Sequence, residues 1–178
     1  MPEDPAREQL LDAAERVFYA RGIQAVGMDE LRAAAGLPLK RIYQLYPGKD
    51  DLVVAFLRRR HTRMMTAIRA NTEHAAEPAL ALFDWLRDWF SEPGFRGCAW
   101  LNAYGELGPT NAGVAEEARR HKREFRALLI GLADGYPADV AHAVYLLAEG
   151  AIAAAAISGT AEPAVEARRV AETLLRPL

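Results

Sequence analysis

Cysteine is nearly absent from this 178-residue chain, in which Cys98 is the only one. A single thiol excludes a disulfide within the chain and fits a reducing compartment. A long apolar run is also missing: the longest nearly apolar stretch, Ala151 to Ile157, is far shorter than the roughly 20 residues needed to span a bilayer. The first ten residues lack the basic start and apolar core of a secretory signal. We therefore expect a soluble cytoplasmic protein without a membrane partner.

Patterns for metal or phosphate chemistry are missing as well. Glu117 and His121 share a helix face, but no paired Glu-x-x-His, Cys-x-x-Cys or His-Glu-x-x-His pattern occurs. The sequence also has neither a Gly-rich phosphate loop nor a nucleophile elbow. We therefore expect no metal site, no cofactor and no enzymatic activity.

Charge is present but unevenly spread, although the formal net charge is only −2. Residues 1–69 hold 12 Lys and Arg against 9 Asp and Glu, whereas residues 70–178 hold 10 against 15. A mildly basic N-terminal part on an acidic body suits local contact with DNA. The alternative is a chance asymmetry in a solvated surface.

Helical periodicity, with Pro and Gly at the expected ends, covers most of the chain, and no period-2 strand pattern or internal repeat occurs. We predict an all-α fold of about nine helices. Their expected ranges are 5–21, 28–35, 38–46, 49–71, 78–90, 97–107, 115–133, 137–157 and 163–175.

The stretch from Gly22 to Leu52 has the layout of a helix-turn-helix, because two short helical patterns flank the turn at residues 35–38. On a wheel at 100° per residue, Ile42 and Tyr46 of the second helix point toward the other helices. The outward side is predicted to face DNA, with Arg, Lys and Gln suited to base edges, Leu to a thymine methyl, and Lys49 and the Tyr43 hydroxyl to phosphates. These candidate DNA-binding residues are Lys40, Arg41, Tyr43, Gln44, Leu45 and Lys49. A solvated helix face is the alternative.

The segment AVGMDELRAAAGLPLKRIYQLYPGKDDLV, from Ala25 to Val53, resembles the N-terminal domain of the tetracycline-repressor (TetR) family of transcriptional regulators. The likeness extends over residues 6–57. It rests on three motifs, namely Ala35-Gly36-Leu37, Ile42-Tyr43-Gln44-Leu45-Tyr46 and Gly48-Lys49-Asp50-Asp51-Leu52. A weaker likeness to some members continues in residues 97–102, with Gly97-Cys98 and Asn102, and in His121-Lys122.

The resemblance implies a helix-turn-helix DNA-binding domain over residues 1–48 and a helical ligand-binding and dimerisation domain over residues 49–178. The function that it implies is a homodimeric regulator, first of all a repressor, that binds a palindromic double-stranded DNA operator and is released by a small apolar effector. The chain departs from the family pattern at Gly27, where Ser or Thr usually caps the helix, and at Pro38 and Leu39, which replace a small polar residue and Lys. The operator sequence is therefore not transferable from relatives.

Most of the large aromatic side chains lie in the C-terminal part. Aromatic walls with a few polar groups are what an apolar ligand needs, and the family usually holds its ligand among the C-terminal helices. We assign a pocket to Trp85, Trp89, Trp100, Asn102, His121, Phe125, Tyr145 and Glu149. The alternative is that each aromatic belongs to the core.

The run AEGAIAAAAISG, from Ala148 to Gly159, consists almost entirely of small residues, which let helix backbones approach closely. The last two helices form the two-fold dimer interface in proteins that this chain resembles. We predict an interface at Ala151, Ala154, Ala155 and Ser158, with an intrachain contact as the alternative.

Two features have a structural and a functional interpretation. The basic run Arg58, Arg59, Arg60 and Arg63 lies about 16 Å along its helix from Lys49, so an interdomain or solvated role competes with outer phosphate contacts. Cys98 is either inert packing or a redox sensor. Two rival functions are a helical enzyme for a hydrophobic substrate and a protein-interaction bundle that does not bind DNA.

Overall fold

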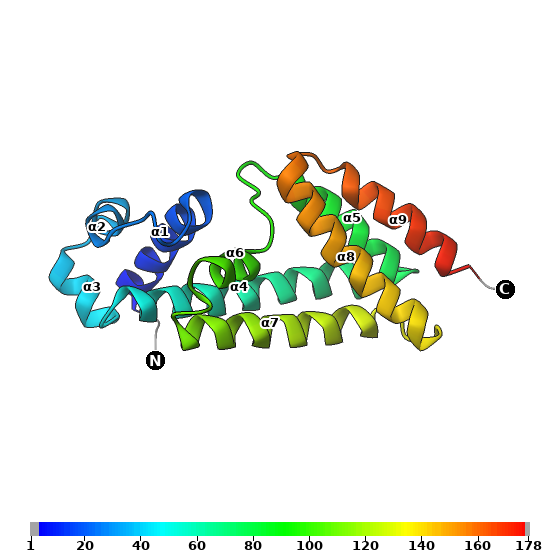
Figure 1. Ribbon diagram of the computed structural model, residues 1–178, viewed down its shortest axis with the longest axis horizontal. Coiled ribbons are helices and arrows are strands. Elements are labelled where there is room, and N and C mark those ends of the chain that lie inside the picture. Colours follow the sequence, from blue (N-terminus) through cyan, green and yellow to red (C-terminus); the bar gives the residue numbers. More distant parts are fainter. Residues whose placement is uncertain (1–3, 177–178) are drawn as a thin grey trace. The chain divides into compact units, whose positions relative to one another are not determined.

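The computed structural model describes residues 4–176, which form nine helices and no strand (Figure 1). This confirms the all-α prediction. The helices are α1 (Pro5–Arg21), α2 (Met28–Ala35), α3 (Leu39–Leu45), α4 (Lys49–Thr72), α5 (Pro78–Phe90), α6 (Ala99–Leu107), α7 (Ala112–Gly131), α8 (Ala138–Ser158) and α9 (Glu162–Leu174).

Side-chain caps set the starts of α1 and α7. Asp4 caps α1 by accepting the backbone N–H of Ala6 at 3.0 Å, and Pro5 occupies the first turn, where no N–H donor is needed. The start of α7 differs from its expected position by three residues. The reason is Asn111, whose side chain accepts the backbone N–H of Val114 at 3.0 Å and so caps the first turn of the helix.

Contacts divide the chain into two compact units. The first comprises the chain up to His61 together with Ala99–Arg120, and the second comprises Thr62–Cys98 and the chain from His121 onward. The division therefore falls within α4 and within α7. The predicted boundary between residues 48 and 49 separates a DNA-binding part from a ligand-binding part by function, not by contacts. It stays a prediction.

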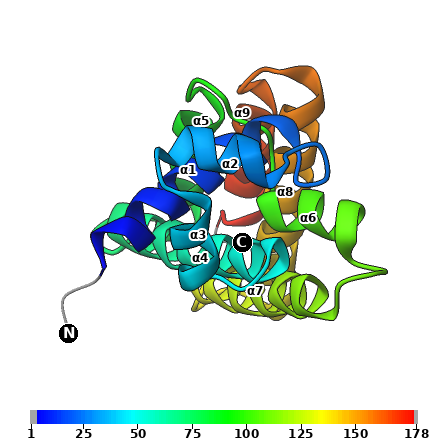
Figure 2. The ribbon, with the colours of Figure 1, turned by 90° about the vertical axis from the view of Figure 1, so that its left-hand side faces the viewer.

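The core of the first unit brings α1, α2, α3 and the start of α4 together (Figure 2). The Phe18 and Phe56 rings lie 5.9 Å apart, between α1 and α4. Leu31 of α2 and Ile42 of α3 are completely buried. Burial of one apolar face per helix holds these short helices in place, since helices of seven or eight residues are marginal alone.

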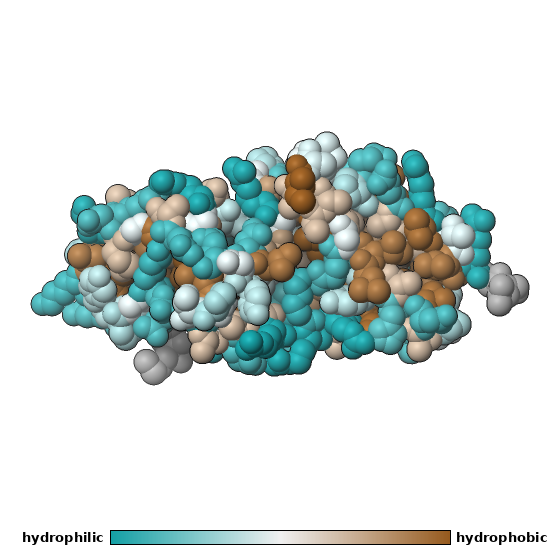
Figure 3. All heavy atoms as spheres, in the orientation of Figure 1, coloured by the Kyte–Doolittle hydropathy of each residue, from teal (hydrophilic) through white to brown (hydrophobic). Residues whose placement is uncertain are grey.

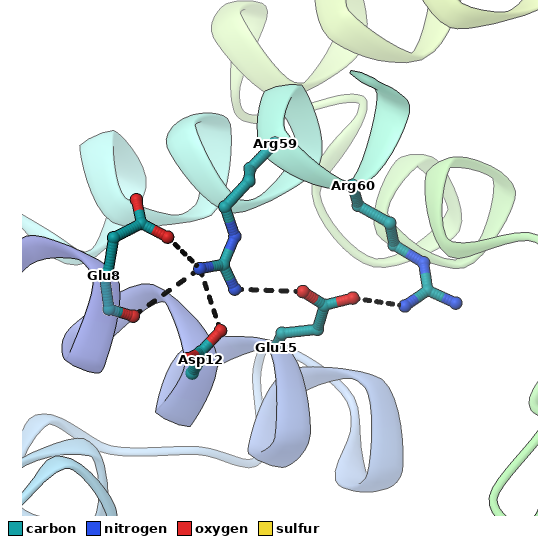
Figure 4. A network of polar contacts seen from close by, with 5 residues as sticks. All are labelled: Glu8, Asp12, Glu15, Arg59 and Arg60. Carbon is teal, nitrogen blue, oxygen red and sulfur yellow. Dashed lines mark hydrogen bonds and ion pairs between the residues drawn. The ribbon is translucent and has the colours of Figure 1, made fainter. Parts of the chain in front are cut away.

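Arginines of α4 bind carboxylates of α1 (Figure 4). The Arg59 guanidinium lies 2.9–3.0 Å from Glu8, Asp12 and Glu15, and Arg60 lies 2.7 Å from Glu15. Arg59 and Arg60 therefore join α4 to α1 within the first unit, where both side chains are largely buried.

In the second unit, α5, α8 and α9 pack against one another. Ala155 of α8 and Ala164 and Ala171 of α9 are completely buried, so these helices meet through small side chains. By length and composition, α8 is apolar enough to cross a membrane, with a mean hydropathy of 1.7 over its most apolar window. The apolar character of α8 thus extends well beyond the run at residues 151–157, although the helix itself lies where it was predicted. The core helices of soluble proteins can be equally long and apolar, and α8 contacts α5 and α9.

Candidate nucleic-acid interface

The helix-turn-helix is built from α2, residues 36–38 and α3. Side chains of α1 bind the last carbonyls of α2. The Gln9 amide donates to the Ala35 carbonyl at 2.6 Å, and Arg16 donates to the Ala34 carbonyl at 3.1 Å. Such partners satisfy carbonyls that a helix leaves unpaired at its C-terminus. The first helix therefore fixes the turn from which α3 begins.

The outer face of α3 carries Lys40, Tyr43 and Gln44, all of them exposed. Tyr43 is a large side chain with 46% of its surface in solvent. These three predicted residues lie where the sequence placed them. Long polar side chains with free rotation on a short, braced helix are suited to reach base edges and phosphates.

Leu45 does not belong to this outer face. It is buried, as is Tyr46, and it follows Ile42 by three residues. Residues three apart lie on nearly the same side of a helix, so Leu45 packs into the core with Ile42. The prediction that Leu45 contacts DNA is wrong.

Arg41 is held at the start of α1. Its Nη2 lies 2.5 Å from Oδ2 of Asp4, the residue that caps α1, and its Nη1 lies 3.5 Å from Oε1 of Gln44. An arginine has five N–H donors, so this pair leaves donors for another acceptor. Both side chains of the pair are more than a third exposed, and its energetic contribution is therefore small.

Lys49 is the first residue of α4 and is half-buried. Its Nζ lies 5.9 Å from the centroid of the Phe18 ring, at the outer limit of a cation–π contact. Within the first unit, the predicted set thus reduces to Lys40, Arg41, Tyr43, Gln44 and Lys49.

The residues assigned to a ligand pocket fall into separate groups. Trp100 and Asn102 belong to the first unit, where Trp100 meets the His61 ring edge-on at 6.2 Å and Asn102 is exposed. Trp85 and Trp89 stack at 5.4 Å in the second unit, and Trp89 also meets Phe95 at 5.0 Å. These tryptophans form an aromatic cluster of their own.

The remaining four predicted pocket residues do come together in the second unit. His121 stacks on Phe125 at 5.5 Å, and Phe125 meets Tyr145 edge-on at 6.5 Å. Glu149 lies beside them and accepts hydrogen bonds from Lys122 at 2.5 and 2.8 Å. Lys122 also belongs to this group, although its sequence context did not predict it.

Electrostatics distinguish this group, which we name the Lys122–Glu149 site and define as Lys122, Glu149, His121, Phe125 and Tyr145. Burial favours neutral Lys122, but neighbouring Cys98 and Glu149 outweigh it and hold the pKa of the ammonium above its ordinary value. Burial and the Glu149 charge raise the pKa of the Tyr145 hydroxyl. The site therefore holds a charged pair and a neutral phenol against aromatic rings at neutral pH.

A cleft of about 360 Å³ lies elsewhere in the second unit, between α5 and α9. Its lining includes Asp84, Arg87 and Arg168 and none of the eight predicted pocket residues. Among the residues from 4 to 176, no group of three or more His, Cys, Asp and Glu side chains is placed to hold a metal ion.

The predicted dimer residues divide by burial. Ala151 and Ala155 are buried within the chain, so their side chains cannot contact a second subunit, and this part of the prediction is wrong. Ala154 and Ser158 are exposed. Figure 3 shows apolar side chains gathered over α8 and α9, and four large apolar residues of these helices are exposed, namely Leu146, Ile157, Val170 and Leu174.

Comparison with known proteins places this arrangement in a family. The family model described as bacterial regulatory proteins, tetR family, matches residues 10–56. The HTH-type transcriptional regulator BetI of Rhizobium meliloti is 33% identical over 159 residues, which cover 85% of this chain and 74% of BetI. The chain belongs to the TetR family of bacterial transcriptional regulators.

Other TetR-family relatives match over different lengths. The HTH-type transcriptional activator FasR of Mycolicibacterium smegmatis is 39% identical over 69 residues, and the match spans only 32% of FasR. The crystal structure of SCO4454, a TetR-family regulator from Streptomyces coelicolor, superposes with a TM-score of 0.87 at 30% identity and covers 96% of this chain and 94% of that one. Reduced E. coli NemR shares the fold, with a TM-score of 0.83 at 23% identity over 96% of this chain and 98% of NemR.

Proposed function

We propose that this TetR-family protein is a ligand-responsive transcriptional repressor that binds a palindromic operator as a homodimer. The observation that carries the proposal is the exposed Lys40–Tyr43–Gln44 face of α3, held on a helix-turn-helix braced by α1. The names of its relatives support regulation of transcription, although FasR is an activator. These relatives give no support to the rival functions, an enzyme or a bundle that does not bind DNA.

The proposed DNA-binding face of α3 is tested by removing one side-chain contact at a time. Gln44→Ala is expected to cost about 1–3 kcal/mol of operator binding and to relax specificity at one base pair, because Gln pairs with a base edge. Lys49→Ala is expected to weaken binding to all DNA sequences about equally, because it removes one phosphate contact. The plot of log affinity against log salt concentration is expected to become less steep by about 0.9. Mobility-shift titrations on DNA flanking the gene, at several salt concentrations, measure both effects.

Arg119→Ala serves as the matched control, since Arg119 is an exposed cation on α7 of the same unit. It removes one positive charge without touching α3. Equal affinity of parent, Gln44→Ala and Lys49→Ala would contradict the proposed face. A reporter gene behind the same DNA then separates repression from activation.

The proposed effector site is the Lys122–Glu149 site. Its aromatic rings suit an apolar body, and the charged pair suits one or two polar groups on the ligand. Effector binding there is proposed to favour a spacing of the two DNA-reading helices that does not fit the operator. Such a ligand weakens operator binding only by its differential affinity for the two states, typically about 5- to 150-fold.

Substitution at this site is expected to change ligand response without changing DNA binding. Apolar metabolites and drugs are titrated while tryptophan fluorescence and operator affinity are followed together. For a compound that releases DNA, Tyr145→Phe should raise the half-effective concentration several-fold, because the phenol hydroxyl is lost. Tyr136→Phe, which removes a hydroxyl bound to Glu77, is the matched control. An unchanged response in Tyr145→Phe and in Phe125→Ala would rule out this site.

A further inference from the structure

The first turn of α1 contacts α3 near both of its ends. Near the start of α3, Oδ2 of Asp4 lies 2.5 Å from Nη2 of Arg41. At the other end, the Arg7 guanidinium lies over the ring of Tyr46, the C-cap of α3, at 4.9 Å from the ring centroid. All four residues belong to the first unit. The start of α1 is therefore placed to orient side chains on the outer face of α3.

Asp4 uses its two carboxylate oxygens for two different helices. Oδ1 accepts the backbone N–H of Ala6 at 3.0 Å and so caps α1, whereas Oδ2 accepts a charge-assisted hydrogen bond from Arg41. The cap ties the carboxylate to the backbone of α1. Arg41 is thus bound to a group that is itself held in place.

Arg41 in turn faces the amide of Gln44. Nη1 of Arg41 donates to Oε1 of Gln44 at 3.5 Å, a long hydrogen bond between residues three apart on one helix face. A guanidinium carries N–H donors and no acceptor, so it faces the amide through the amide oxygen and not through the NH2 group. Gln44 is exposed, and its NH2 group is the end of the amide that points away from Arg41.

The orientation of this amide decides which base edge it fits. In the major groove, adenine presents one donor and one acceptor, and a Gln amide binds both only with its oxygen and its NH2 group together. Guanine presents two acceptors, N7 and O6, which suit the two donors of an NH2 group. Held through Oε1, the Gln44 amide therefore suits guanine better than adenine.

We propose that Asp4 is a positioning residue that sets the base specificity of Gln44: through Arg41 it holds the amide so that Gln44 reads guanine rather than adenine. The inference rests on the proposed function, because it assumes that Gln44 contacts a base edge. The pair of Asp4 and Arg41 adds little to stability, since both side chains are more than a third exposed. Specificity does not need a strong pair, because the two orientations of an exposed amide differ little in energy and one charged neighbour selects between them.

The first experiment measures base preference with the full-length protein. Asp4→Ser keeps a good helix cap, but its side chain is too short to reach Arg41. A duplex that the parent protein selects from a random-sequence pool is varied at the base pair where Gln44→Ala loses discrimination. The parent is expected to prefer guanine over adenine there by about 5- to 150-fold. Asp4→Ser is expected to bind the two duplexes nearly equally, whereas a merely structural role of Asp4 would weaken binding to both by the same factor.

Two control variants test the path through the amide. Gln44→Glu keeps the length of the side chain but replaces its NH2 group by an acceptor oxygen, so the preference for guanine is expected to be lost. Direct contact of Arg41 with guanine gives the opposite results: Gln44→Glu would keep the preference, and Asp4→Ser, which releases Arg41, would increase it. Asp29→Ser removes a carboxylate that is 91% exposed on α2, so it changes the net charge equally and is expected to leave the preference unchanged.

The second experiment needs no DNA. A hydrogen bond to Asp4 slows the rotation of the Arg41 guanidinium about its Nε–Cζ bond, and the arginine Nη signals in NMR spectra measure this rotation. In the parent, rotation at Arg41 is expected to be several-fold slower than at Arg32, which is 51% exposed and lies 3.7 Å from Asp29. In Asp4→Ser the two rates are expected to be similar.

The outcomes separate this inference from the proposed function. If the parent selects no duplex, the proposed function fails and the inference fails with it. If the parent selects a duplex, the inference alone is overturned by a preference for adenine over guanine at the varied base pair, by an unchanged preference in Asp4→Ser, or by the results expected for direct contact of Arg41 with guanine. It is also overturned if Gln44→Ala loses discrimination at no base pair, or if the Arg41 guanidinium rotates equally fast in the parent and in Asp4→Ser.

Discussion

The double substitution Leu146→Glu and Ile157→Glu is expected to convert the protein to a monomer and to lower operator affinity at least about 100-fold. Both side chains are exposed on α8, Ile157 to 90%, and the neighbouring helix α9 also exposes apolar side chains, Val170 and Leu174. A two-fold interface would bury them, and an unpaired carboxylate is costly to bury. A monomer binds only one half-site of the operator. It therefore loses the roughly 10²–10⁴-fold gain in affinity that two linked DNA-binding domains provide.

Light scattering gives the oligomeric state, circular dichroism the helix content, and mobility-shift titration the affinity. Helix content is expected to stay at the parent value, because neither side chain contributes to the core of the chain. Leu101→Glu, at an exposed leucine of α6, is the control for adding a charge at an apolar surface position. An intact dimer with both substitutions on α8 would exclude this face as the interface.

Arg59→Met is expected to destabilise the protein by about 2–4 kcal/mol, slightly less than the roughly 3–5 kcal/mol for breaking a buried ion pair, because its carboxylate partners are partly exposed. Arg59 is only 12% exposed and binds three carboxylates, among them Glu15, which is 20% exposed. Its removal leaves these carboxylates close together without a common cation. Their repulsion weakens the packing of α1 on α4, on which the position of α3 depends.

Urea unfolding measures this loss; the protomer concentration is kept fixed because the stability of the proposed dimer would depend on it. Arg32→Met is the control: Arg32 is 51% exposed and pairs with exposed Asp29, so a change below about 0.5 kcal/mol is expected. Arg59→Lys is expected to lie between parent and Arg59→Met. If Arg59→Met unfolds at the same urea concentration as the parent, the network of Figure 4 does not stabilise the first unit.

The helix-turn-helix and the exposed residues on it were predictable because their signals are local. Prolines and glycines mark helix ends through backbone geometry that acts over three or four residues, as at Pro5 and Pro78. The wheel placed Lys40 and Gln44 outside correctly. Leu45 follows Ile42 by three residues, so the same wheel places it on the buried side with Ile42. It was nevertheless assigned to the DNA-facing side.

Which surface of α8 is free could not be predicted from its composition. Small residues occur on every side of this helix, so the run 148–159 carries no periodic signal to separate an intrachain face from an exposed one. Packing against α5 and α9 buries Ala151 and Ala155 and leaves Ala154 and Ser158 outside. The residues predicted to line one pocket lie in separate groups for a similar reason. The aromatic content of a sequence gives no information about which rings come into contact.

By itself, the sequence determined the helices, the family and most of the exposed face of α3, because each depends on residues within a few turns of one another. Tertiary structure alone decided that Asp4 holds Arg41, that Lys122 pairs with Glu149, and that Glu106 binds the turn before α2. These partners are 27 to 83 residues apart in the chain. No local pattern encodes such pairs, since each forms only after hydrophobic burial has brought separate helices together.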